Sequence, residues 1–150
     1  MPFFSTLSRA PTAALLLGFG GLIPFVCLGL SAFTGLGFEA GLARRLLAEY
    51  GAVILAFVGA LQWAYAVRED DSGTLAWLRF GWSVVPALLA WGALQLPVAG
   101  SLRVLAGGLL AALVMDFLLR PPRLAAWLMP LRTLLTGVGS ACLWMGSVGT

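Results

Sequence analysis

The chain has 150 residues, of which 61% are hydrophobic and only 10% are charged. Soluble domains carry about 25% charged residues, so this composition excludes an ordinary soluble domain. All of the basic residues are arginine, and the formal charge of +3 is in such a chain an orientation signal more than a sign of nucleic-acid binding. We expect a single integral membrane domain over residues 1–150, in contact with membrane lipids and with no nucleic-acid partner.

Apolar segments separated by turns extend along the whole chain, and each is close to the roughly 20 residues that a helix needs to cross a bilayer. The first uncharged run, residues 11–37, exceeds the usual signal-peptide core of about 7–15 residues, so we expect it to be retained as a helix. We predict an all-α polytopic bundle of five transmembrane helices, at about residues 12–33, 46–67, 78–96, 102–119 and 131–148.

Small residues and prolines interrupt these segments. Pro24, together with nearby glycines, predicts a kink in the first helix, because such residues persist in lipid where neighbouring helices pack closely. Residues 35–49 contain two arginines and two glutamates, and are typical of an interfacial turn or amphipathic segment before the second helix. Small residues recur at every fourth position and predict faces for close helix approach. They are Ala52, Ala56, Ala60 and Ala64, and the pairs Gly107/Ala111 and Gly108/Ala112.

The arginines predict the orientation in the membrane. Six of them fall at the N-terminus and in the second and fourth connections: Arg9, Arg68, Arg79, Arg120, Arg123 and Arg132. Three fall on the opposite side: Arg44, Arg45 and Arg103. Arginine accumulates on the cytoplasmic side, so we expect the N-terminus inside and the C-terminus outside. The bias towards Ala, Leu, Gly and Arg indicates a bacterial source, and we therefore expect a multi-pass protein of the bacterial inner membrane.

Polar residues from four predicted helices fall at a similar depth. Asp116 is the only aspartate outside the polar loop 69–74. With a rise of about 1.5 Å per residue, Asp116 lies roughly 6 Å inside the nearest arginine boundary, and Ser83 and Thr136 lie equally deep. Gln62 lies roughly 9 Å inside. These residues predict a polar layer beneath the inner interface.

Asp116 needs a partner, because an unpaired carboxylate costs about 2–3 kcal/mol at mid-bilayer. Arg132 is the preferred partner and Arg120 is the alternative. The pair is either a staple between the last two helices or part of a pocket that holds a lipid phosphate or a quinone head. A proton or ion path is a third interpretation. The candidate ligand-binding residues are Gln62, Trp63, Arg79, Trp82, Ser83, Asp116, Arg120, Arg132 and Thr136.

The sequence contains few of the residue types that usually act in enzyme active sites. Histidine and lysine are absent, no pair of carboxylates has catalytic spacing, and Cys27 and Cys142 lie in separate apolar runs. We therefore predict a protein that is not an enzyme, with no catalytic residues, no metal and no cofactor.

Four segments carry a resemblance to a known family. They are LGFGGLIPF (17–25), YGAVILAFVGALQW (50–63), GWSVVPALLAW (81–91) and the run from Asp116 through Trp127 to LRTLLT (131–136). Together they resemble small bacterial and mitochondrial membrane proteins of unknown function, the family typified by transmembrane protein 69. Gln62 stands where that pattern leads us to expect a basic residue. The resemblance implies an inner-membrane location and supplies no activity.

The functional prediction rests on the polar layer and the small-residue faces. We expect an accessory or assembly component of a larger membrane complex, or a component that binds a lipid or quinone in a polar inner-leaflet pocket. The alternative is a small oligomeric transporter or channel in which Asp116 is the proton or ion site. Other membrane-protein subunits and a second copy of the chain both remain open as partners.

Overall fold

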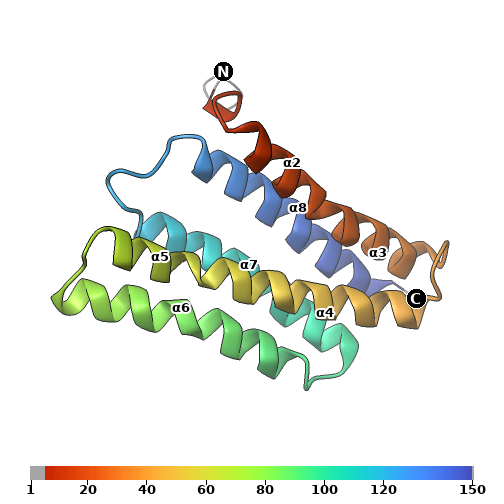
Figure 1. Ribbon diagram of the computed structural model, residues 1–150. Helices are drawn as coiled ribbons and strands as arrows, with labels where there is room; N and C mark the ends of the chain where they lie inside the picture. Colours follow the sequence, from red (N-terminus) through yellow and green to blue (C-terminus); the bar gives the residue numbers. More distant parts are fainter. Residues whose placement is uncertain (1–5, 150) are drawn as a thin grey trace.

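The computed structural model describes residues 6–149, and every regular element in that range is a helix (Figure 1). The helices form five rods, which confirms the all-α prediction and the count of five. The first rod is α2 (Thr12–Gly20) with α3 (Leu22–Thr34), and the second is α4 (Ala40–Gly59) with α5 (Leu61–Arg68). The others are α6 (Gly73–Ala93), α7 (Val98–Leu118) and α8 (Leu128–Val148).

Four of the rods are long and apolar enough to cross a membrane: Thr12–Thr34, Ala40–Arg68, Gly73–Ala93 and Val98–Leu118. The fifth rod, α8, has 21 residues but falls short in apolarity, so the prediction of five spans is supported for four. The polar residues of α8 explain the difference. Arg132, Thr136 and Ser140 are all buried against other helices, so α8 belongs to the interior of the bundle and presents less of its surface to lipid.

The first rod is interrupted at Gly21, between α2 and α3. Proline has no backbone N–H, and its ring clashes with the carbonyl four residues earlier, which for Pro24 is the carbonyl of Gly20. The regular helix is therefore interrupted close to the position of the predicted kink, on the N-terminal side of the proline. The amide of Gly21 donates to the carbonyl of Leu17 at 2.9 Å and so caps the end of α2.

The second rod begins at Ala40, six residues before the predicted start, so the predicted turn is confined to residues 35–39. The carboxylate of Glu39 accepts hydrogen bonds from the amides of Gly41 (2.9 Å) and Leu42 (2.8 Å). These amides belong to the first turn of the helix, where N–H groups have no carbonyl acceptor within the helix. The Glu39 side chain supplies that acceptor and so acts as the N-cap. The cap allows the helix to start at once after the turn at residues 35–39.

The last three helices also begin earlier than predicted, at Gly73, Val98 and Leu128, whereas the first begins at Thr12 as predicted. The sequence pattern placed their starts near an arginine or the first long apolar run. In the structure each of these helices starts directly after the preceding turn, several residues before the predicted start. For example, α7 starts immediately after Pro97. The predicted layer at constant depth is unaffected, because depth was counted along the helices.

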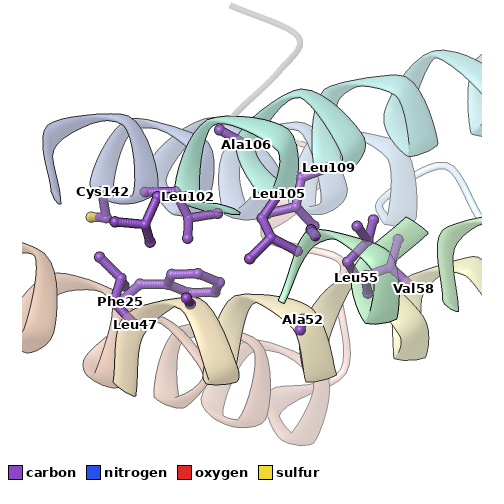
Figure 2. Close-up of a cluster of buried hydrophobic side chains, with 14 of the residues drawn as sticks. Phe25, Leu47, Ala52, Leu55, Val58, Leu102, Leu105, Ala106, Leu109 and Cys142 are labelled. Carbon is purple, nitrogen blue, oxygen red and sulfur yellow. The ribbon is translucent and has the colours of Figure 1, made fainter. Parts of the chain in front are cut away.

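The second rod is the centre of the packing, since α4 contacts α3, α6, α7 and α8. Its buried leucines meet those of α7, while α8 lies between α7 and α3. Figure 2 shows apolar side chains from these helices gathered in one core. Its larger members are Phe25, Leu47, Leu55, Leu102, Leu105 and Leu109.

Glycines, more than alanines, set the closest helix contacts. A Cβ added to Gly59 would lie 2.7 Å from the ring of Pro86, and one added to Gly108 would lie 2.7 Å from Leu55 Cδ2. The predicted alanine face of the second rod is only partly correct, because Ala52 is buried whereas Ala60 and Ala64 are exposed.

The fourth predicted helix carried two small-residue pairs. Gly108 and Ala112 face the core, whereas Gly107 and Ala111 are exposed. Only the first of these pairs is therefore used for packing within the chain.

The connections gather at two ends of the bundle (Figure 1). The connections at 69–72 and 119–127 lie at one end, and those at 35–39 and 94–97 lie at the other, together with the end of α8. This alternation agrees with the predicted order of the loops. The assignment of one end to the inside of a cell remains a prediction.

Candidate functional site

Asp116, in the last turn of α7, is the centre of a buried hydrogen-bonded cluster. Its Oδ2 accepts hydrogen bonds from Arg132 Nε (3.1 Å) and Arg132 Nη2, and its Oδ1 accepts one from Gln62 Nε2 (2.9 Å). Both carboxylate oxygens are therefore occupied, and the ion pair is buried on both sides. The predicted Asp116–Arg132 pair is confirmed, whereas Arg120, the alternative partner, is exposed. We refer to Gln62, Asp116 and Arg132 as the Asp116 cluster.

The local sequence explains how three helices deliver these side chains to one place. Pro121 and Pro122 follow α7 closely, and a proline cannot continue a helix without losing a hydrogen bond. The chain therefore turns and returns as α8, which packs against α7. Asp116 near the end of one helix and Arg132 near the start of the next then lie at the same level. Gln62 joins them from α5, just after the break at Ala60.

The cluster has no net charge, because one carboxylate is matched by one guanidinium. Hydrogen bonds between charged groups are roughly twice as strong as neutral ones, and the surrounding apolar helices lower the local dielectric. One atom remains unsatisfied: within residues 6–149, Gln62 Oε1 has no hydrogen-bond partner although Gln62 is 0% exposed.

An apolar cavity of about 180 Å³ reaches the cluster. Arg132 and Thr136 are the two polar side chains among its lining residues, and the other lining residues are apolar or glycine. Leu17 and Phe57 line the cavity and are also exposed on the outer surface of the bundle. The cavity therefore communicates with the side of the bundle, between the first and second rods. Thr136 lies one helical turn after Arg132 and is buried as well.

Two predicted site residues, Arg79 and Ser83, make hydrogen bonds outside the Asp116 cluster. Arg79 Nη1 pairs with Asp71, and Arg79 Nη2 donates to the carbonyl of Leu119 at 3.0 Å. This buried arginine thus fixes the connection after α5 to the end of α7. Ser83 donates to the carbonyl of Phe80 in its own helix at 2.6 Å. Neither Arg79 nor Ser83 makes a hydrogen bond to the Asp116 cluster.

The two predicted tryptophans lie outside the cavity. Trp63 is exposed, and its ring meets that of Phe80 edge to face with the centroids 4.9 Å apart. Trp82 is half-buried on α6. Of the nine candidate residues, the structure therefore brings together Gln62, Asp116, Arg132 and Thr136.

The cavity walls contributed by the first rod were not predicted. Gly18, Gly21 and Phe25 from this rod are among the lining residues, together with Arg132 and Thr136 of α8. The glycines at 18, 20 and 21 could have indicated a cavity beside the first helix, because a glycine leaves space where other residues carry a side chain. A Cβ added to Gly18 would lie 3.2 Å from Leu135, another lining residue. Periodicity along one helix does not reveal which neighbour faces such a gap.

Comparisons with known proteins agree with the membrane character of the chain. Residues 10–148 match the family described as "Protein of unknown function (DUF3429)". Transmembrane protein 69 of Xenopus tropicalis is 39% identical over 138 residues, which cover 88% of this chain and 52% of that protein. The chain therefore spans about half the length of this relative. No solved structure matches.

Proposed function

The chain belongs to this family of unknown function, DUF3429, and we propose that it binds an amphiphilic membrane component, a lipid or a quinone, in the cavity beside the Asp116 cluster. The observation that carries this proposal is the placement of Arg132 and Thr136 in a cavity whose other walls are apolar. Binding sites for small molecules have this character: mostly apolar walls and a few polar groups that fix the orientation of the ligand.

The charge balance indicates which head group would bind. Asp116 neutralises Arg132, so the cavity meets an arginine with spare N–H donors and little net positive charge. Such a donor suits a neutral acceptor better than a multiply charged phosphate. An ester carbonyl of a lipid or a ring carbonyl of a quinone would accept from Arg132 and from the Thr136 hydroxyl.

The size of the cavity limits how much of the ligand it encloses. Sites that surround a drug-sized molecule have volumes of about 300–1,000 Å³, whereas this cavity has about 180 Å³. We infer that it holds a head group or the start of a chain. The remainder of the ligand would leave past Leu17 and Phe57 into the bilayer.

The cellular role that fits such a protein is an accessory one. We propose a non-enzymatic component of the bacterial inner membrane, with its N-terminus inside, that supports a larger membrane complex. The exposed small residues Gly107 and Ala111 support an association with other subunits or with a second copy, because small residues allow close helix approach in membranes.

The alternative is a transporter or channel with Asp116 as the proton or ion site. We rank it second because the carboxylate is already held by Arg132 and Gln62, which suits a fixed charge better than one that exchanges protons. Proton flux in proteoliposomes that Asp116→Asn abolishes would reverse this order.

Native mass spectrometry of the gently extracted full chain tests the binding proposal. Val58→Phe places a larger side chain on a buried wall of the cavity, and Val53→Phe makes the same change at an exposed position of α4 outside it. We expect the wild type and Val53→Phe to retain a bound lipid or quinone, and Val58→Phe to lose it.

Thr136→Val provides a second test that leaves the packing nearly unchanged. It removes the hydroxyl and keeps the shape of the side chain, so retention of the ligand should fall about threefold to tenfold for one lost hydrogen bond. Equal retention by the wild type, Val58→Phe and Thr136→Val would contradict the proposal.

A further inference from the structure

A second cavity, this one with charged and polar lining residues, lies at the other end of the bundle. It is formed by α4, the connection from α6 to α7 and the start of α7. Its volume is about 290 Å³, close to the lower limit of about 300 Å³ for small-molecule sites. Its polar lining residues are Arg45, Glu49 and Ser101, and its apolar ones are Ala48, Leu94, Leu96 and Val98. We call it the α7 N-terminal cavity.

The two charged side chains of this cavity form an ion pair that leaves some of their hydrogen-bond donors and one acceptor unused. Arg45 Nε donates to Glu49 Oε1 at 3.0 Å, one helical turn apart. Within residues 6–149, the two terminal nitrogens of Arg45 and the second oxygen of Glu49 have no hydrogen-bond partner. The pair thus offers donors on one side and an acceptor on the other, with a net charge of zero.

A buried hydroxyl also lacks a partner here. Ser101 is 2% exposed, and its Oγ makes no hydrogen bond within the described residues. An unsatisfied buried hydroxyl is unfavourable, by about 1–3 kcal/mol for a typical polar group. Ser101 lines the cavity, so its hydroxyl would find the missing partner in a bound ligand after rotating about the Cα–Cβ bond.

The start of α7 adds a third feature. This 21-residue helix follows Pro97, and no side chain caps it. The free N–H groups of a helix N-terminus carry a partial positive charge and bind oxyanions. The oxyanion part of a ligand would therefore lie near Val98 and Ser101, with Arg45 beside it.

From these three features we propose that the α7 N-terminal cavity binds a zwitterionic head group, an oxyanion joined to a primary ammonium, as in phosphatidylethanolamine. The oxyanion would accept hydrogen bonds from Arg45, Ser101 and the α7 N-terminus. The ammonium would donate to the free oxygen of Glu49. A simple anion would be repelled by Glu49, and a quaternary ammonium has no N–H to donate to it.

The surroundings favour a lipid over a water-soluble zwitterion. Leu94 and Leu96 line the cavity and are exposed on the surface of the bundle, so they would contact the glycerol and the chains of a lipid. The site is separate from the Asp116 cluster. Ser101 and Asp116 are 15 residues apart on α7, which corresponds to about 22 Å along the helix.

Thermal unfolding of the purified full chain in detergent, with added lipid, tests this proposal. The probes are short-chain phosphatidylethanolamine, phosphatidylcholine and phosphatidylglycerol, and the water-soluble compound phosphoethanolamine. We expect phosphatidylethanolamine to raise the unfolding temperature more than the other two lipids. Glu49→Gln should weaken its binding about tenfold or more, because a hydrogen bond to a charged group is lost.

Matched variants separate the site from general surface charge. Arg45→Gln should also weaken binding of phosphatidylethanolamine, whereas Arg103→Gln, at an exposed arginine outside this cavity, should not. Ser101→Ala should reduce affinity and retain the fold. An equal effect of phosphoethanolamine would identify the head group alone as sufficient, and would still support the site. Equal stabilisation by all three lipids, or unchanged binding in Glu49→Gln, would overturn the proposal.

Discussion

Asp116 shows how a single carboxylate is accommodated among apolar helices. Two groups from different helices hold its two oxygens, so the charge is matched in place. Removing one partner of a buried pair leaves the other charge uncompensated, which is more costly than replacing both by apolar residues. The consequence for stability can be measured residue by residue.

Asp116→Ala should destabilise the protein by about 3–5 kcal/mol, because Arg132 would remain buried without its partner. The double variant Asp116→Leu/Arg132→Met should recover most of this loss. Chemical unfolding in detergent measures both variants. The surface pair Arg68–Glu69 is the control, since an alanine at Arg68 should change stability by about 0.5 kcal/mol or less. Equal losses in Asp116→Ala and Arg68→Ala would contradict the interpretation of the cluster.

At the scale of the helices, local chemistry decides where each rod begins and bends. Pro24 displaces the break to Gly21, and Glu39 starts α4 directly after a turn. Glycines then decide how closely the rods approach. Gly59 lies against Pro86, and Gly108 lies against Leu55. Substitutions at these positions should therefore affect packing, whereas substitutions at open glycines should affect only the helix itself.

Gly59→Ala should destabilise the bundle by about 1–3 kcal/mol, as is typical of overpacking. The added methyl group would meet the rigid ring of Pro86 at 2.7 Å, so a backbone must move. Gly81→Ala is the matched control, because no described atom lies within 4 Å of its added Cβ. Alanine has the higher helix propensity, so this control should be neutral or slightly stabilising. A thermal scan that ranked the two variants in the opposite order would refute the packing argument.

Glu39 makes the start of α4 sensitive to acid. Hydrogen bonds from the amides of Gly41 and Leu42 lower the pKa of Glu39 below its ordinary value of 4.5. The cap therefore contributes its full stability above about pH 4.5, and this contribution is lost as the pH falls through the lowered pKa of the folded state. Glu39→Ala should be less stable than the wild type at pH 7, and the difference should disappear on acidification. A difference that is constant from pH 7 to pH 3 would contradict the cap.

At the scale of the whole molecule, the sequence predicted the class of fold, the number of rods and the Asp116–Arg132 pair. These features follow from the lengths of apolar runs and from the need of a buried charge for a partner. The depth count also brought Gln62 and Thr136 to the correct level. It did not reveal that Ser83 bonds to Phe80 in its own helix, because depth along a helix does not specify the direction in which a side chain faces.

The limits of the sequence prediction have a common physical origin. Which rods are neighbours depends on side-chain packing across the bundle, and this decided that Gly59 and Gly108, more than the alanine face, set the closest contacts. The cavity depends on a gap among the first rod, the second rod and α8, which no single helix encodes. The cap at Glu39 depends on backbone geometry at one residue, and a glutamate five residues before Arg44 gives no unique sign of it.

Photo-crosslinking with a lipid and a quinone that carry a diazirine near the head group tests the central claim most directly. We expect crosslinks on the full chain to concentrate on lining residues such as Leu17, Phe57 and Leu135. The Val58→Phe substitution should abolish these crosslinks. Leu88, which is exposed on α6 and lies outside the cavity, should be labelled weakly and equally in both proteins. Labelling of Leu88 as strong as that of Leu17, and unchanged by Val58→Phe, would show that the probe only coats the bundle and would contradict a binding cavity beside the Asp116 cluster.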